Sequence, residues 1–230
     1  MPVAVITGAS RGLGRALATE LARRQWQLVL DARGAEDLAA VQAQLPGGPH
    51  HALAGDVTDP VHRASLVTTA RALGGASLLV NNASSLGASP LQAFGDLDPA
   101  TYVDLLRVNL VAPMALTAAL LPQLRTHEGW VLNISSDAAV QPYETWGGYG
   151  SSKAALDHAS RVLAAEEQAI RVYSLDPGDM RTRMHQDAFP DEDISDRPEP
   201  ETVVPAVLSL LDSDLPSGRY VAGELVEEAA

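Results

Sequence analysis

The chain has 230 residues, of which 46% are hydrophobic and 20% charged, a composition that suits one α/β domain with a full-sized core and excludes wholesale disorder. Its formal net charge is −13, so a nucleic-acid backbone would be repelled, and no basic patch in the sequence offsets that total. There is no cysteine, which excludes disulfides and thiolate metal sites.

Two further classes are disfavoured by the order of residues. The first expected strand begins at residue 3, which leaves no room for a secretory leader. No apolar run approaches the ~20 residues that a membrane helix needs. We therefore expect a cytoplasmic protein that has neither nucleic acid nor a membrane among its partners, and that holds no metal ion.

A short β-branched run at residues 3–6 predicts the first strand, and a glycine-rich turn and a helical pattern follow it. Free backbone N–H groups and the positive end of the helix dipole can hold a phosphate at such a junction. Gly8, Gly12 and Gly14 permit a tight turn and close approach of the backbone to a ligand. Their spacing differs from the commonest dinucleotide fingerprint, so an ordinary strand-to-helix turn is the alternative.

The second expected strand covers residues 27–31, and Arg33 lies just beyond its end. In a doubly wound fold this place meets the adenosine ribose, where an acidic residue favours a free 2′-hydroxyl and an arginine favours a 2′-phosphate. Arg33 and Arg11 could bind that phosphate through charge-assisted hydrogen bonds. Asp31 favours NAD(H) but comes two residues too early. We expect NADP(H), with NAD(H) as the second option; two merely solvated arginines are the alternative.

Four further strands are expected along the chain, at residues 51–57, 77–83, 130–136 and 170–175. Asp56 could accept a hydrogen bond from an adenine amino group, or cap the helix that begins near Pro60. Asn81 and Asn82 could bind the cofactor or tie neighbouring strands together, with turn chemistry as the alternative. A serine in the place of Ser136 is, by itself, more often only a hydrogen bonder at a strand end.

The second half of the chain adds a long helical region at about residues 99–124, in which Asn109 stands among apolar residues and so needs a specific partner. Residues 187–201 are rich in Asp, Glu and Pro. They predict a mobile substrate loop at about 179–200, with a plain solvated linker as the alternative. A helix at about 201–211 and a short strand near 219–221 close the chain.

Strands that alternate with helices at this spacing predict an α/β fold with a doubly wound parallel sheet covered by helices on both faces. The ligand crevice of such a fold lies at the carboxyl ends of the strands. The polar residues named above fall at those ends. We therefore expect one domain over residues 1–230 with a single ligand crevice.

Tyr149 and Lys153 stand four residues apart where a helix is expected to begin, so they share one face of that helix. Lys153 is the only lysine in the chain. A compact ammonium there has properties that a guanidinium cannot replace. Such a pair would arise by chance roughly once in fifty sequences of this composition, so its surroundings decide its meaning.

Taken in order, these motifs resemble the classical short-chain dehydrogenase/reductase family over nearly the whole chain. The matching positions are Thr7–Gly8 with Gly12 and Gly14, Asp56–Val57, Asn81–Asn82–Ala83, Asn109, Ser136, Tyr149 with Lys153, and Pro177–Gly178 with Thr182. The resemblance implies a single-domain Rossmann fold with about seven strands, hydride transfer between an alcohol or carbonyl substrate and NAD(P), and a homodimer or homotetramer. Ser84 and Ala139 depart from the pattern, because the family usually has glycine at both places.

The resemblance also implies the roles of individual residues. Tyr149 would exchange a proton with the substrate oxygen, and Ser136 would hydrogen-bond the same oxygen. Lys153 and the positive nicotinamide ring of the oxidised cofactor would favour the phenolate, since roughly 4 kcal/mol is needed to bring a phenol to a pKa near 7. Lys153 would also reach the nicotinamide ribose. Asn109 would hold a water that links Lys153 to solvent. The implied cofactor-binding residues are Gly8, Ser10, Arg11, Gly12, Leu13, Gly14, Arg33, Asp56, Val57, Asn82, Ala83, Tyr149, Lys153, Pro177, Gly178, Met180 and Thr182.

The substrate is expected beside Ser84, Asp137, Trp146 and His185. Trp146 would form an apolar wall or only pack, and His185 would touch substrate or merely sit on its loop. A serine nucleophile is disfavoured because no G-x-S-x-G turn surrounds Ser136. The competing class is a catalytically silent NAD(P)-binding regulatory or scaffold protein, which would not need an intact set of Ser136, Tyr149 and Lys153.

Overall fold

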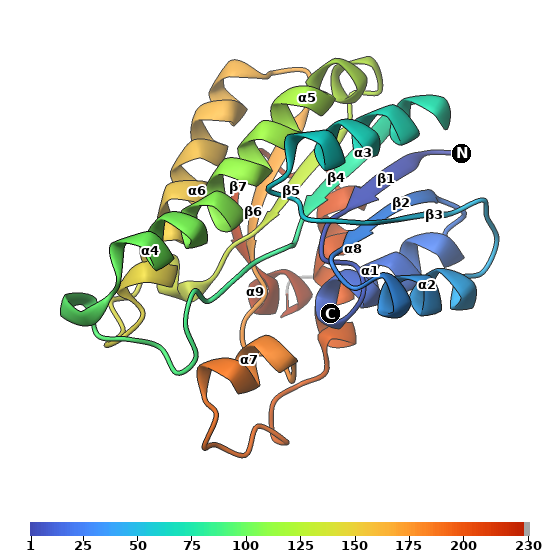
Figure 1. Cartoon of the computed structure of the whole chain (residues 1–230). Helices are drawn as coiled ribbons and strands as arrows, with labels where there is room; N and C mark the ends of the chain where they lie inside the picture. The colour runs from blue at the N-terminus through green and yellow to red at the C-terminus, as the bar shows by residue number, and fades with distance from the viewer. Residues whose placement is uncertain (228–230) are drawn as a thin grey trace.

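The computed structural model describes residues 1–227, which form one sheet of seven strands in the order β3-β2-β1-β4-β5-β6-β7 (Figure 1). All neighbouring strands are parallel. The strands are β1 Val3–Ile6, β2 Gln27–Ala32, β3 His51–Ala54, β4 Ala76–Asn81, β5 Trp130–Ile134, β6 Arg171–Asp176 and β7 Gly218–Val221. The expected doubly wound Rossmann sheet is confirmed.

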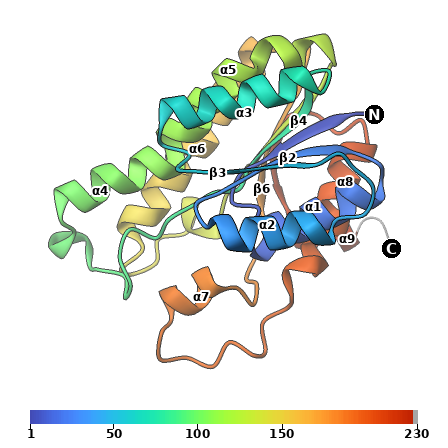
Figure 2. The same ribbon diagram turned by 45° about the vertical axis from the view of Figure 1, so that its right-hand side comes forward.

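Helices cover both faces of the sheet (Figures 1 and 2). They are α1 Gly12–Arg23, α2 Ala35–Gln44, α3 Pro60–Ala72, α4 Pro99–Leu106, α5 Ala112–Thr126, α6 Gly147–Glu166, α7 Arg183–Ala188, α8 Val204–Asp212 and α9 Ala222–Glu227. Helices α1, α2, α8 and α9 share a hydrophobic core with one face, and α3, α5 and α6 share a second core with the other. The loop that contains α7 lies beyond the carboxyl ends of the strands (Figure 1).

The two cores follow from the alternation of side chains along each strand. In β1, Ala4 and Ile6 belong to one core, and Val3 and Val5 belong to the other. Successive residues of a strand point to opposite faces, so a strand buried on both sides is apolar throughout. This explains why the short run at residues 3–6 is recognisable as a central strand of a parallel sheet.

Three strands end earlier than the sequence suggests, and one of them is β4, which stops at Asn81. β3 stops at Ala54 and β5 stops at Ile134, so Asp56 and Ser136 lie in the loops that follow rather than within the strands. Of the two alternatives for Asp56, the capping role is wrong. The cap of α3 is Asp59, whose Oδ1 accepts a hydrogen bond from the Val61 N–H at 2.9 Å, because the residue directly before an N-terminal proline takes the capping position.

The expected continuous helix over residues 99–124 is interrupted. A π-helical turn at Arg107–Val111 separates α4 from α5, and Asn109 lies buried in its centre. A π-turn inserts an extra residue into a helix and is frequent at functional sites. The combined run Pro99–Thr126 has 28 residues and is, by length and composition alone, apolar enough to cross a membrane, contrary to our expectation. In the fold, α5 packs against β4 and α3 as a core helix.

The C-terminal part differs from expectation in two details. The expected loop at 179–200 contains helix α7, Arg183–Ala188. A short helix, α9, follows β7 and packs against α8. Neither helix has enough residues for a helical period to stand out in the sequence.

Candidate active site

The glycine turn after β1 is fastened to the end of β4, at the point where the strand order reverses. The Thr7 hydroxyl accepts hydrogen bonds from the N–H groups of Asn82 and Ala83, both at 3.0 Å. The Asn82 amide in turn donates to the carbonyl oxygens of Thr7 at 2.9 Å and Gly8 at 3.1 Å. Asn82 thus supports the wall of the crevice by binding the backbone of the turn, while Asn81 ties β4 to β5 through Asn133.

The turn leaves no space for side chains at two of its glycines. A Cβ atom on Gly14 would lie 2.4 Å from the carbonyl oxygen of Gly8. Gly8 has a φ of +66°, and its Cβ would lie 2.9 Å from Nδ2 of Asn82. Arg11, which precedes α1, makes no capping hydrogen bond through its side chain within residues 1–227. The N–H groups of the first helical turn are therefore available to an anionic group such as a phosphate.

A cleft of about 670 Å³ runs along this edge of the sheet, a size typical of sites for small molecules and cofactors. Its walls contain every residue predicted to touch cofactor or substrate except Gly14. Of the four predicted catalytic residues, Ser136, Tyr149 and Lys153 line the cleft. Asn109 does not, and Gly14 acts from behind the wall by letting the turn close on itself. The chain thus brings the predicted residues into one crevice that suits a dinucleotide.

Asp31, the acidic residue that would disfavour NADP(H), lies at the end of the cleft next to β2 and already contacts another side chain. Oδ1 of Asp31 lies 2.6 Å from Nε2 of His62, a residue of α3, and the carboxyl group is buried. Burial raises the pKa of Asp31, whereas the contact with His62 lowers it. Arg11 and Arg33 both line the cleft and are exposed. Sequence reasoning missed His62, because only the fold brings it to Asp31; its ring packs so closely on Gly55 that a Cβ atom there would lie 2.3 Å from it.

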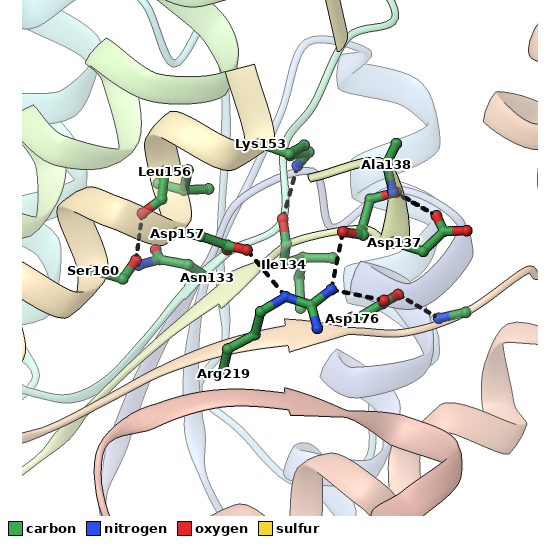
Figure 3. Close-up of polar contacts among 12 residues, drawn as sticks. Asn133, Ile134, Asp137, Ala138, Lys153, Leu156, Asp157, Ser160, Asp176 and Arg219 are labelled. Carbon is green, nitrogen blue, oxygen red and sulfur yellow. Dashed lines mark hydrogen bonds and ion pairs between the residues drawn. The ribbon is translucent and has the colours of Figure 1, made fainter. Parts of the chain in front are cut away.

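Tyr149 and Lys153 lie together on the inner face of α6. Nζ of Lys153 is 5.5 Å from the centre of the Tyr149 ring and donates a hydrogen bond to the carbonyl oxygen of Ile134 at 2.7 Å (Figure 3). Burial raises the pKa of Tyr149 to about 12, although hydrogen bonds with Ser84 and Ser136 act to lower it. Burial lowers the pKa of Lys153 to about 8, and the charge of Asp157 opposes that fall.

A phenol pKa near 7 is not a property of the protein groups alone, because burial of the ring outweighs the hydrogen bonds that favour the phenolate. The phenol of Tyr149 is accordingly protonated at neutral pH. That is the state in which it can donate a proton to a substrate oxygen.

The Ser136 hydroxyl is oriented by its neighbour. Oγ of Ser136 donates to Oδ1 of Asp137 at 2.9 Å and accepts from the Ala138 N–H at 3.1 Å. The other oxygen of Asp137 accepts from the Tyr143 hydroxyl at 2.8 Å. Asp137, predicted as a substrate residue, thus uses its two carboxylate oxygens to orient Ser136 and to hold Tyr143.

Asn109 uses the whole hydrogen-bonding capacity of its amide. Oδ1 accepts from the Ser85 N–H at 2.8 Å and the Ser84 hydroxyl at 3.2 Å. Nδ2 donates to the Ser85 carbonyl oxygen at 2.9 Å and to Oγ of Ser152 at 3.0 Å. The side chain is therefore not free to hold the predicted water. It fixes the loop after β4 against α6, one residue before Lys153.

Trp146 and His185 line the cleft near Tyr149, and Phe189 packs against both rings. The Trp146 ring centre lies 5.6 Å from that of Tyr149 and 5.8 Å from that of Phe189, and the His185 ring lies 5.0 Å from Phe189. Nε2 of His185 is buried and has no hydrogen-bond partner among the described residues. Trp146 is thus part of a row of aromatic rings that runs from α7 to Tyr149. Phe189 was missed, because only the folded loop brings it next to Trp146.

Comparison with known proteins agrees with this geometry. A family model described as short chain dehydrogenase matches residues 2–193. The chain belongs to the short-chain dehydrogenase family. It is 38% identical over 197 residues to the sepiapterin reductase of Xenopus laevis, a match that covers 79% of this chain and 74% of that protein.

Solved structures match this chain over nearly its whole length. The crystal structure of the KRED1-Pglu enzyme has a TM-score of 0.87 at 35% identity and covers 96% of this chain and 100% of that one. A short chain dehydrogenase from Shigella flexneri 2a strain 301, complexed with NADP, has a TM-score of 0.90 at 28% identity, with 96% and 97% of the two chains covered. This short-chain dehydrogenase is therefore an NAD(P)-dependent oxidoreductase that acts on CH–OH or carbonyl groups.

Ser84 departs from the family pattern at a position next to Asn109 and Tyr149. It stands where the family usually has glycine, and its hydroxyl contacts both the Asn109 amide and the phenol of Tyr149. Ala139, the second departure, lies in the short 3₁₀ turn Asp137–Ala139 directly after Ser136. Within residues 1–227, no three His, Asp or Glu side chains gather in a way that could hold a metal ion.

Proposed function

We propose that this short-chain dehydrogenase reduces a carbonyl substrate with NADPH, and that Tyr149 donates the proton. The observation that carries the proposal is the placement of Ser136, Tyr149 and Lys153 in the cleft that the glycine turn also lines. A silent scaffold would have no use for a buried ammonium beside a buried phenol, because both groups are costly to bury.

Each residue has a defined part in this reaction. The bound cofactor supplies the hydride. The Ser136 hydroxyl turns from Asp137 and donates a hydrogen bond to the substrate carbonyl oxygen. The phenol of Tyr149 gives its proton to that same oxygen as the carbonyl becomes an alcohol. Lys153, held by the Ile134 carbonyl, stabilises the phenolate that is left until it takes up a proton again.

The preference for NADP(H) over NAD(H) is supported by charge at the ribose end of the cleft. Arg11 and Arg33 are exposed there, and guanidinium groups bind phosphates through paired hydrogen bonds. Asp31, which would favour a free 2′-hydroxyl, is engaged with His62 instead. The Shigella structure, complexed with NADP, supports the same choice.

The substrate side supports a carbonyl compound with a flat ring. Trp146 and His185, which line the cleft, offer faces on which such a ring can stack, and Nε2 of His185, unpaired within residues 1–227, offers one hydrogen bond. The relatives named sepiapterin reductase, from Xenopus and other vertebrates, act on a ring-bearing substrate by name, which agrees with this class. The loop at about 179–200 would close over that ring.

We also propose that the protein forms a homodimer or homotetramer, as members of the family usually do. Val111 at the end of the π-helical turn, Met114 on α5 and Val162 on α6 are large apolar side chains exposed to solvent, and such groups often mark an interface. Light scattering of the purified protein would measure the assembly directly.

The decisive experiment is a set of carbonyl compounds, with and without rings, assayed by NADPH consumption. Wild-type protein is expected to reduce ring-bearing ketones fastest. Tyr149→Phe is expected to lose more than about a thousandfold in kcat and to keep its affinity for NADPH. Tyr220→Phe, whose hydroxyl bonds only to the Pro216 carbonyl, is the matched control. Turnover unchanged in Tyr149→Phe would remove the phenol from the reaction.

A further inference from the structure

Arg219, on strand β7 next to β6, joins three segments of the active site through one guanidinium group (Figure 3). Its Nε donates to Oδ2 of Asp157 at 3.1 Å. Its Nη2 donates to the carbonyl oxygen of Ser136 at 3.1 Å and to Oδ2 of Asp176 at 2.9 Å. The arginine side chain is 23% exposed, whereas the two carboxylate side chains are 8% and 6% exposed. The group therefore acts at the protein interior, where its contacts are little screened by solvent.

Each of the three partners adjoins a part of the reaction site. Asp157 lies one helical turn after Lys153 on the inner side of α6. Ser136 supplies its backbone carbonyl to Arg219, while its hydroxyl lies on the cleft side. Asp176 also accepts a hydrogen bond from the Gly178 N–H at 3.1 Å, which fixes the turn that lines the cleft beyond β6.

The geometry of the group requires an arginine. Three acceptors are served at once by a planar fork with fixed donor directions, which a single ammonium cannot reproduce. Loss of Arg219 would leave the buried carboxylates of Asp157 and Asp176 without their cation. Asp157 would be affected most, because its Oδ1 already has no hydrogen-bond partner among the described residues. The carbonyl of Ser136 would lose its hydrogen bond from this side as well.

We propose that Arg219 is a positioning residue, which holds Ser136 and the Pro177–Gly178 turn in register with the helix that carries Tyr149 and Lys153. It touches neither substrate nor cofactor in this role. Its effect on rate comes from placement, because a displacement of about 1 Å at a reacting group can cost about a hundredfold. The inference rests on the catalytic roles proposed above for Ser136 and Tyr149.

The test is Arg219→Lys, which keeps the charge but not the fork. We expect kcat to fall about tenfold or more, the KM for the carbonyl substrate to change less than about threefold, and the dissociation constant for NADPH to rise about threefold. Arg24→Lys is the matched control, because Arg24 also bonds a carboxylate, Asp212 at 2.7 Å, but at the far end of α1. That variant is expected to match wild type.

A second variant separates placement from folding. Arg219→Ala is expected to lose more activity than Arg219→Lys and to regain part of its kcat when guanidinium chloride is added at low concentration, whereas Arg24→Ala shows no such gain. Wild-type kcat and NADPH affinity in Arg219→Lys would overturn the inference, as would a loss of kcat that only follows the folded fraction. If the wild-type protein reduces no carbonyl, the proposed function fails. The inference then depends on the dissociation constant of Arg219→Lys for NADPH alone: a rise supports it, and a value equal to wild type overturns it.

Discussion

Replacing Ser84 with alanine should change the pH dependence of turnover, because the Ser84 hydroxyl lies between Asn109 and the phenol of Tyr149. A hydroxyl has one proton to donate. While the phenol is protonated, that proton goes to Oδ1 of Asn109 at 3.2 Å. When the phenolate forms, the hydroxyl can turn to the charged oxygen, since Oδ1 of Asn109 keeps its second hydrogen bond, from the Ser85 N–H at 2.8 Å.

The size of the effect follows from the two hydrogen bonds that exchange. A hydrogen bond to a charged group contributes about 1.5–3 kcal/mol and a neutral one about 0.5–1.5 kcal/mol, so the phenolate gains about 1 kcal/mol net. At about 1.4 kcal/mol per pH unit, that corresponds to about 0.7 of a pH unit. Ser84→Ala removes this gain, so the pKa of Tyr149 rises. Alcohol oxidation requires the phenolate as base, so its acidic limb moves to higher pH by this amount.

The assay is the pH profile of kcat for alcohol oxidation with NADP⁺, measured on wild type and Ser84→Ala. Ser151→Ala is the control, because its hydroxyl also lies at the start of α6 but bonds to the Gly148 carbonyl and Tyr102. An acidic limb that stays in place, or moves to lower pH, in a folded Ser84→Ala protein would refute the reasoning. An equal shift in Ser151→Ala would do the same, since the effect would not depend on contact with the phenol.

Three further outcomes follow from the same geometry. Lys153→Met should abolish turnover yet raise the free energy of unfolding at pH 7 by about 3 kcal/mol, because a buried ammonium whose pKa falls from 10.5 to about 8 destabilises the folded state by about 1.4 kcal/mol per unit. Between pH 8 and 10.5 the unfolded chain binds more protons, so wild type should regain that difference as pH rises, which chemical denaturation can follow. Arg33→Ala should narrow the ratio of NADPH to NADH affinity measured by fluorescence titration; equal affinities in the wild type would contradict the proposed preference. Gly14→Ala should weaken NADPH binding more than about tenfold and destabilise the fold by about 1–3 kcal/mol, since its Cβ meets the Gly8 carbonyl oxygen at 2.4 Å, whereas Gly223→Ala, with open space around it, should do neither.

Local patterns were sufficient for most of the architecture. Strand positions could be read from short apolar runs, since a strand buried on both faces is apolar at every position. The ends of those strands were less certain. β3 and β5 both stop before the polar residues that seemed to end them, because pairing with a neighbouring strand, and not polarity, decides where a strand ends.

Within the site, the meeting of Tyr149 and Lys153 was predictable, and the contacts that hold the surrounding side chains were not. Tyr149 and Lys153 are four residues apart on one helix, so their meeting follows from helical geometry. Asn109 was singled out as an amide in need of partners, but the partners proved to be serines on another loop and another helix. Because these partners use the whole amide, the side chain of Asn109 cannot hold the water that we expected there.

The sequence by itself determined the alternation of strands and helices, the bend at the glycines and the Tyr149–Lys153 pair, because each depends on residues within a few positions of one another. The tertiary structure alone decided the contacts between distant residues. Arg219 lies 83 positions from Ser136, and His62 lies 31 positions from Asp31, so no local period or spacing connects them. A buried polar group must find a partner, but which partner it finds depends on what the sheet and its helices bring within hydrogen-bonding distance.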